Sequence, residues 1–289
     1  MSKKISILIA NYNNGEFFQD CWNSLVNQTY SNWQAIIVDD KSTDNSVEII
    51  RQIIHGDSRA KLHINERNLG CGYTKRRCAE LGCGELYGFL DPDDTLEPNA
   101  LELMNSVFSE NTSVVLAYSK HRRYDSTLTN IISKEYNISS IDSKDIFYFN
   151  LSGTITAFAV FKADAYKKTA GIDAYMLRAV DQDLYLKLCE MGETMPVHEY
   201  LYKYRIHANG ISTGDGIATV SKAEYWQWYA INAAAKRRGV YVEDLFSQYY
   251  INKSMYNKLA KDYQLVLNSV GFKLSRKLSA VKSIFFKKK

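Results

Sequence analysis

The sequence predicts an α/β protein with a mostly parallel sheet flanked by helices, followed by a helical carboxyl-terminal region. Three observations predict this class. Short apolar runs alternate with segments of helical periodicity in the first third of the chain, which is typical of parallel strands joined through helices. A cluster of polar residues follows each of these runs. From about residue 221 the strand pattern ceases, and long helical patterns rich in Tyr and Trp replace it.

The apolar runs and the helical spacing place the elements in order. Continuous apolar runs predict four strands, at residues 5–10, 35–38, 62–64 and 86–90. Apolar residues at helical spacing predict helices that contain Phe18, Cys21 and Leu25, then Val47, Ile50 and Ile54, then residues 74–81, then Leu101, Met104 and Phe108. Later strands are expected at 114–118 and 155–161, with a variable loop region at roughly 120–150.

The polar clusters lie where the predicted strands end. They are Asn11–Asn14, Asp39–Ser42, Asn65–Gly70 and Asp91–Asp94. Because parallel α/β sheets bind ligands at the carboxyl ends of their strands, these clusters predict a binding site at one edge of the sheet.

Asp91 and Asp93 are separated by one residue, so both carboxylates project to the same face if the strand continues. Their mutual repulsion favours a divalent cation, and Mg²⁺ is usually held by one or two carboxylates together with substrate phosphates. The sequence Asp-Pro-Asp-Asp before a helix also favours a plain turn, and from this motif alone the turn is the better interpretation.

Other candidates have similar alternatives. Asp39 and Asp40 could accept hydrogen bonds from a base or ribose, or cap the next helix. Lys75 could face a diphosphate or belong to a solvated helix face. Asp181 and Asp183 begin a helix, where the helix dipole keeps a carboxylate ionised and able to accept a proton, and one of the pair is expected to act as a cap. His207 could bind metal or phosphate, although most single histidines do neither.

Composition and charge exclude several classes. The 289 residues carry 36 basic and 32 acidic side chains, a net charge of +4, in an ordinary globular composition. No window is apolar for long enough to span a membrane, and the amino-terminal apolar run is short for a signal peptide, so we expect a cytoplasmic protein with five reduced cysteines. Residues 267–289 form a basic amphipathic pattern, which predicts either a helix at an anionic membrane surface or a final helix packed on the core.

Taken in order, the motifs resemble the family 2 inverting glycosyltransferases with the A-type (GT-A) Rossmann-like nucleotide-sugar fold. The resemblance covers roughly residues 3–215 and rests on SILIANYNN at 6–14, VDDKSTDNS at 38–46, NLGCGYTKRR at 68–77, FLDPDD at 89–94, AVDQDLYLKL at 179–188 and YRIHANGIS at 204–212. Two departures are the Val at 180, where the family often has Glu, and the Tyr-Thr-Lys-Arg at 73–76.

The resemblance implies a role for each candidate. Asp181 is the catalytic base, and Asp93 and His207 hold Mn²⁺ or Mg²⁺. Asp91 and Asp93 form the family's DxD motif, and Asp91 lies nearer the ribose. The expected nucleotide-binding residues are Asn11, Asp39, Asp40, Asn68, Lys75 and Asp91.

The sequence therefore predicts a metal-dependent enzyme that moves a sugar from a nucleoside diphosphate sugar, with uridine as the expected base, to a glycan or lipid-linked acceptor in surface polysaccharide synthesis. The predicted organisation is a glycosyltransferase domain at 1–220, with a nucleotide half at 1–95 and an acceptor half at 96–220, followed by a helical region at 221–289. We expect a place on the inner face of the cell membrane and no nucleic-acid partner. The alternatives are an inactive nucleotide-sugar-binding scaffold and a sugar nucleotidyltransferase.

Overall fold

The computed structural model describes residues 2–133, 138–142, 144–208, 210, 217–241, 243, 258–259, 261–265 and 268–269. The chain divides into two compact units, Met1–Arg238 and Gly239–Lys289. The predicted basic tail at 267–289 lies, apart from residues 268–269, outside the described residues. In the part of the chain that is described, no helix is both long and apolar enough to cross a bilayer.

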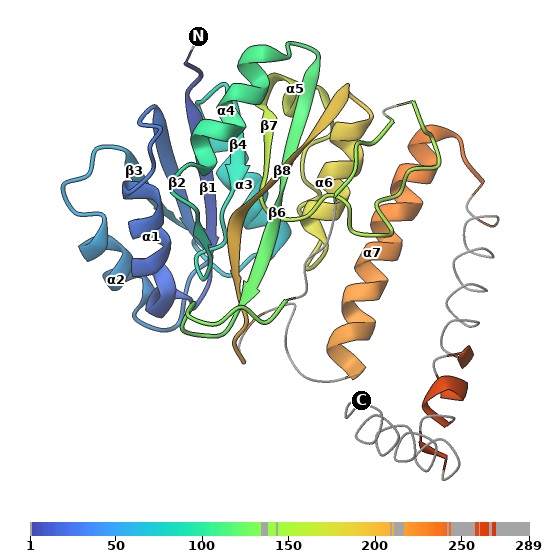
Figure 1. The fold of residues 1–289 in the computed structure, drawn as a ribbon. Coiled ribbons are helices and arrows are strands. Elements are labelled where there is room, and N and C mark those ends of the chain that lie inside the picture. Colours follow the sequence, from blue (N-terminus) through green and yellow to red (C-terminus); the bar gives the residue numbers. More distant parts are fainter. Residues whose placement is uncertain are drawn as a thin grey trace, which may run out of the picture. The chain divides into compact units, whose positions relative to one another are not determined.

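An eight-stranded sheet forms the centre of the first unit, with strand order β3-β2-β1-β4-β7-β6-β8-β5. The strands are β1 (Ile5–Asn11), β2 (Trp33–Asp39), β3 (Ala60–Ile64), β4 (Leu86–Phe89), β5 (Thr95–Leu96), β6 (Val114–Tyr124), β7 (Ala159–Lys162) and β8 (Glu193–Arg205). Strands β3, β2, β1 and β4 are parallel, β7 is antiparallel to both of its neighbours, and β6 is parallel to β8. The predicted mostly parallel sheet is confirmed (Figure 1).

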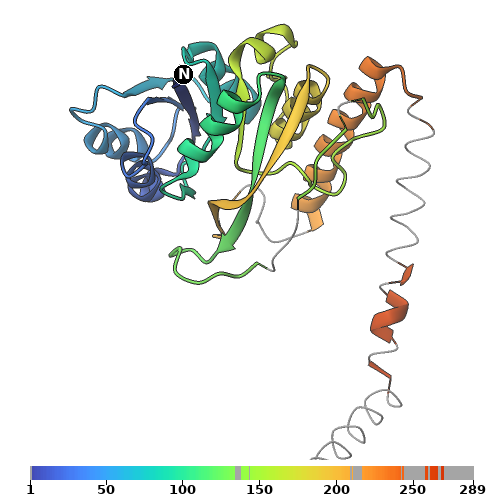
Figure 2. The same cartoon turned by 45° about the horizontal axis from the view of Figure 1, so that its top comes forward.

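Helices cover both faces of this sheet (Figures 1 and 2). They are η1 (Gly15–Phe17), α1 (Phe18–Val26), α2 (Ser46–Ile53), α3 (Cys71–Leu81), α4 (Ala100–Glu110), α5 (Ala163–Lys168), α6 (Val180–Cys189) and α7 (Ile217–Arg238). One apolar core joins the sheet to α1, α2 and α4, and a second joins the other face to α3, α5, α6 and α7. Apolar residues of β1 and β2 alternate between the two cores, which explains why their sequences are mostly apolar. The polar exceptions within them, Ser6 and Gln34, are buried and hydrogen-bonded to each other at 2.8 Å.

Helix α7 extends the first unit beyond the predicted boundary. The sequence predicts a division after residue 220, whereas the first compact unit continues to Arg238. The reason is that α7 buries Trp226, Ala230 and Ala234 and lies alongside α6 in both views (Figures 1 and 2). Arg238 also donates to Glu190, the residue after α6, at 2.9 Å. The helical pattern is correct, and this helix belongs to the sheet-containing unit.

Strand β8 was not predicted, and β6 extends to Tyr124, into the region expected to be loop. The pattern that indicates β8 is the alternation of Tyr200, Tyr202 and Tyr204, which has the period of a strand. The short strand β5 and the short helix α5 were also not predicted as elements. Because β8 pairs with both β6 and β5, it brings the segment before His207 back to the end of β4.

Candidate active site

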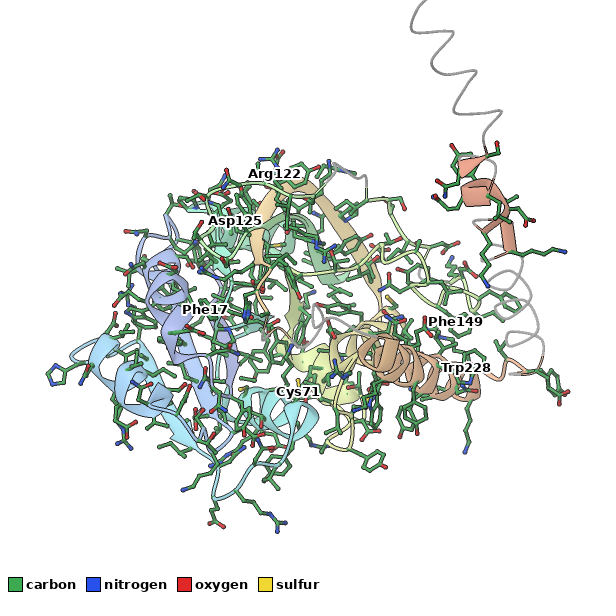
Figure 3. All side chains as sticks on the ribbon, turned by 90° about the horizontal axis from the view of Figure 1, so that it is seen from below. Phe17, Cys71, Arg122, Asp125, Phe149 and Trp228 are labelled. Carbon is green, nitrogen blue, oxygen red and sulfur yellow. The ribbon has the colours of Figure 1, made fainter. Side chains whose placement is uncertain are left out.

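The predicted site residues gather at the carboxyl ends of the strands. Figure 3 views the molecule from this end, where its labels on Phe17 of η1 and Cys71 of α3 mark the helices that follow β1 and β3. The ends of β1, β2 and β4 lie side by side. Asp40, the residue after β2, accepts a hydrogen bond from the amide of Gly70, the residue before α3, and Arg205 at the end of β8 donates to Asp94 in the 91–94 turn. The site therefore combines segments from almost the whole length of the first unit.

Asp39 is fully buried and is held by its neighbours. Its Oδ2 accepts hydrogen bonds from Nδ2 of Asn11 at 2.7 Å and from the hydroxyl of Ser42 at 2.6 Å, and its Oδ1 accepts one from the Ser42 amide. Because a carboxylate cannot donate, this contact fixes the Asn11 amide with its NH₂ toward Asp39. The Oδ1 of Asn11 is consequently a buried acceptor with no donor among the described residues.

Asp40 anchors the loop between β3 and α3. It accepts hydrogen bonds from Nδ2 of Asn65 at 2.7 Å and from the amides of Leu69 and Gly70 at 2.9 and 2.8 Å. Both predicted aspartates thus organise the site from within. Asn65, which begins the polar cluster predicted after the third strand, is a buried member of the site for which the motifs assign no role of its own. Asn68, in the same loop, is exposed.

Lys75 lies beside the 91–94 turn and pairs with Asp91. Its Nζ lies 3.2 Å from Oδ1 of Asp91, and its side chain is only 12% exposed. Burial by itself lowers the pKa of Lys75, but the charges of Asp91, Cys71 and Asp181 outweigh it and raise the pKa well above the ordinary value. Lys75 is therefore a charged group within electrostatic range of both carboxylates, which supports the site prediction over a solvated helix face.

Asp93 faces His207 across the site. Oδ2 of Asp93 is 2.9 Å from Nε2 of His207, and burial, followed by the charge of Asp91, raises the pKa of Asp93. Among the described residues, no three His, Cys, Asp or Glu side chains are arranged to hold a metal ion without help. One carboxylate and one imidazole that converge do fit a divalent cation whose remaining ligands are substrate phosphates and water.

A buried network behind Asp93 was not predicted from the sequence. Asp94 accepts a hydrogen bond from the Tyr202 hydroxyl at 2.7 Å and another from the Arg205 amide at 2.7 Å. The Arg205 side chain donates from Nε to the Asp93 carbonyl at 2.7 Å and from Nη2 to Asp20 at 2.8 Å. The strand period of the tyrosines in β8 is the one signal in the sequence that points toward this arrangement.

Asp181 lies exposed in the first turn of α6, next to a tightly packed connection. The residue before the helix, Ala179, adopts a left-handed conformation with φ of 52°. Just upstream, the carbonyl of Met176 accepts a hydrogen bond from the Gly72 amide at 2.9 Å, and a β-carbon on Gly72 would lie 2.4 Å from that oxygen. This contact holds the chain before Asp181 against the start of α3, on which Lys75 lies.

Asp183 does not cap the helix, because it forms a buried ion pair instead. Its Oδ2 is 2.5 Å from Nζ of Lys187, which also donates to the Gly171 carbonyl at 2.8 Å. Both side chains are at least nine-tenths buried, at 2% and 8% exposure. The pair therefore ties α6 to the segment that leads into it.

Removing one member of this pair is expected to destabilise the protein strongly. Lys187→Met should lower the free energy of unfolding by about 3 kcal/mol, because a buried charge loses its partner, although Arg237 remains 3.9 Å from the other Asp183 oxygen. Urea denaturation measures the change. Lys203→Met, which breaks the more exposed pair with Glu97, is the matched control and should cost under about 1 kcal/mol. An equal cost for the two variants would contradict this account of the pair.

The comparison with known proteins decides the family. Residues 6–170, more than half of the chain, match the model of "Glycosyl transferase family 2". The chain belongs to this family. The matched segment contains the ends of β1, β2, β3 and β4 and the turn with Asp91 and Asp93, so the resemblance inferred from the motifs is confirmed.

Several curated relatives are similar over most of this chain. The chondroitin synthase of Escherichia coli is 30% identical over 237 residues, which are 82% of this chain and 33% of that protein. The hyaluronan synthase of Pasteurella multocida is 27% identical over 263 residues, 90% of this chain and 26% of that protein. The chain thus spans a third or less of the length of these relatives. An uncharacterized glycosyltransferase of Haemophilus influenzae, 22% identical, is matched over 90% of its length.

Solved structures confirm the GT-A fold. TarS of S. aureus in complex with UDP-GlcNAc gives a TM-score of 0.63 at 16% identity, with 80% of this chain and 66% of that chain covered. The mannosyltransferase PcManGT of Pyrobaculum calidifontis, in complex with GDP-Man and Mn²⁺, gives a TM-score of 0.58 at 13% identity, with 97% and 85% covered.

Proposed function

We propose that the protein is a metal-dependent inverting glycosyltransferase that moves a sugar from a nucleoside diphosphate sugar to a hydroxyl of a glycan or lipid-linked saccharide. The observation that carries the proposal is the position of α3: its Lys75 contacts Asp91 at 3.2 Å, and its first turn is hydrogen-bonded from Gly72 to the carbonyl of Met176, just before Asp181, at 2.9 Å. Asp91, on the side expected to bind the donor, and Asp181, the expected catalytic base, therefore belong to one candidate site. The family membership supplies the class of reaction.

The nucleotide half of this proposal rests on the ends of β1, β2 and β4. The buried Oδ1 of Asn11 needs a donor, and an N–H of the nucleoside is the group that the proposal assigns to it, while Asp39 and Asp40 keep the surrounding loops in place. Asp91 lies about half-exposed beside Lys75, at the position assigned to the ribose. Lys75 offsets negative charge on the diphosphate.

Asp93 and His207 would hold the divalent cation, which when bound supplies Lewis-acid stabilisation of the charge on the leaving diphosphate. Asp181 is exposed in the first turn of α6, and a carboxylate is a suitable general base. It takes the proton from the attacking hydroxyl. A single displacement with one base inverts the anomeric centre and needs no carboxylate nucleophile.

The donor and the setting are finer parts of the proposal. UDP-sugars are the first choice because neighbours of this fold include a complex with UDP-GlcNAc, and GDP-sugars are the second because another is a complex with GDP-Man. Assembly of a bacterial surface polysaccharide is supported by the similarity to chondroitin and hyaluronan synthases. A cytoplasmic, membrane-peripheral location is proposed from the basic pattern at 267–289.

A thermal-shift screen tests the donor. A ligand that binds only the folded state stabilises the protein, and the effect grows as the ligand concentration exceeds Kd. A matching nucleotide sugar should therefore raise the melting temperature. We expect UDP-sugars to do so with Mn²⁺ and to lose most of the effect in EDTA. Release of a nucleoside diphosphate supports transfer, whereas pyrophosphate release from a nucleoside triphosphate indicates a nucleotidyltransferase. Binding without any turnover indicates the inactive scaffold.

A further inference from the structure

We propose that Arg205 is a positioning residue that aligns Asp93 and His207 from behind, and that it acts on metal-dependent donor binding without touching the donor. The proposal rests on the function proposed above, because it assigns Asp93 and His207 to the cation. It concerns a residue at the end of β8 to which neither the motifs nor the comparisons give a role.

Arg205 joins separate parts of the site through directed hydrogen bonds. Its Nε donates to the Asp93 carbonyl at 2.7 Å, its Nη1 to the Ser126 carbonyl at 2.6 Å and its Nη2 to Asp20 of α1 at 2.8 Å. Its backbone amide donates to Asp94 at 2.7 Å. The residue is only 4% exposed, and its bond to Asp94 is buried, whereas Asp20 has an exposed side chain. The side chain thus fixes the backbone of Asp93, the loop at Ser126 and Asp20 of α1, while the backbone amide of Arg205 holds the Asp94 carboxylate.

The same arginine also borders His207 through a shared aromatic ring. The Arg205 guanidinium lies 4.8 Å from the centre of the Phe17 ring, and that ring lies 4.5 Å from the ring of His207. Because His207 follows Arg205 by two residues and packs on the same Phe17, the direction of its Nε2 toward Asp93 depends on where Arg205 is anchored. Outer-shell contacts of this kind orient the groups that bind a metal.

Tyr202 also holds the Asp91–Asp94 turn in place. Its hydroxyl donates to Asp94 at 2.7 Å and lies 3.3 Å from the amide of Asp91, which donates to it. The residue is 1% exposed, and its ring stacks on Phe158 in the core. The Asp91–Asp94 turn is therefore held by two residues of β8, Tyr202 and Arg205.

Calorimetric titration of UDP, in Mn²⁺ and in EDTA, tests the proposal. Arg205→Lys keeps the positive charge but cannot form all three guanidinium hydrogen bonds. We expect the Mn²⁺-dependent gain in UDP affinity to fall by about 10- to 100-fold. UDP affinity in EDTA should be unchanged. Tyr202→Phe, which keeps the stacked ring, should reduce the same gain by a smaller factor. A general loss of folding would instead weaken both titrations, so the two conditions separate positioning from structural damage.

Two matched variants serve as controls. Arg59→Lys changes an arginine that likewise pairs with an aspartate, Asp57, and lies over an aromatic ring, that of Trp33. Tyr87 is a buried residue of β4, and Tyr87→Phe removes its hydroxyl, which donates to the Gly82 carbonyl. Both should leave the Mn²⁺-dependent gain unchanged. A gain that Arg205→Lys also leaves unchanged, or an equal loss with and without Mn²⁺, overturns the proposal.

A second measurement needs no ligand and separates the proposal from the assigned function. In a crystal structure of unliganded Arg205→Lys, we expect the 2.9 Å contact between Asp93 and His207 to be lost. A variant that keeps this contact overturns the positioning role, whether or not nucleotide binds. Failure of the unaltered protein to bind UDP or GDP with Mn²⁺, together with loss of the contact in the variant, overturns the proposed function and supports the positioning role.

Discussion

Asp181→Asn should lower the rate of sugar transfer by about 10²- to 10⁴-fold while leaving donor affinity intact, because the amide cannot take the proton from the attacking hydroxyl. The side chain is exposed in the first turn of α6, so the isosteric change removes no buried contact. Transfer is measured as nucleoside diphosphate release at saturating donor, and affinity by calorimetry with the same donor and Mn²⁺.

Asp164→Asn is the matched control for this change. Asp164 is also an exposed aspartate in the first turn of a helix, α5, and it lies on an element that contributes no residue to the site. Its substitution should leave turnover within about twofold, in keeping with the small effects of most surface changes. Near-normal transfer by Asp181→Asn would remove Asp181 from the mechanism.

Asp93→Ala should remove most of the metal dependence of the enzyme. A bound cation stabilises the transition state by several kcal/mol, so kcat/KM should fall by about a thousandfold, and added Mn²⁺ should no longer strengthen UDP binding. The residue is part-exposed, at 18% of its side chain, so folding is expected to survive. Stopped assays across a Mn²⁺ titration measure the first effect and calorimetry the second.

Asp57→Ala provides the comparison for Asp93. Asp57 is paired with Arg59 in the turn before β3, so its loss removes a carboxylate and an ion pair away from the site. It should leave the Mn²⁺ titration unchanged. If Asp93→Ala retains a normal response to Mn²⁺, the cation is held elsewhere and the assignment of Asp93 and His207 fails.

Local patterns in the sequence were sufficient to place the first half of the candidate site at the strand ends. Strands β1, β2 and β4 are buried on both faces, so their apolar runs are visible in the sequence, and a polar residue that ends such a run lies at the carboxyl edge of the sheet. This reasoning located Asn11, Asp39 and Asp91. It could not show that Asp39 and Asp40 are occupied by neighbouring donors, because those donors come from other elements.

The remainder of the site depends on contacts between distant parts of the chain. Asp94 and the Arg205 amide are 111 residues apart in sequence, and no local pattern records such a pairing. Antiparallel β7 between β4 and β6 is likewise a tertiary choice that a βα alternation does not predict. The tyrosine alternation in β8 could have indicated the strand, but its partners Asp93 and Asp94 follow only from the fold.

The boundary of the helical region shows the same limit. The sequence places a change of pattern near residue 221, and the helix that begins there is real, but its packing decides the unit to which it belongs. Trp226 and Ala230 are buried in the core shared with α6, so α7 lies on the sheet-containing unit. Helical periodicity predicts which face of a helix is apolar and does not name the surface that covers it.

The stereochemistry of donor hydrolysis tests the central claim most directly, because water can replace the acceptor. ¹H NMR of an α-configured UDP-sugar with the protein and Mg²⁺ follows the anomeric proton of the released sugar before mutarotation. We predict that UDP and the β-anomer form first and that Asp181→Asn abolishes their formation. Initial release of the α-anomer, or release unaffected by Asp181→Asn, would contradict a single displacement assisted by Asp181.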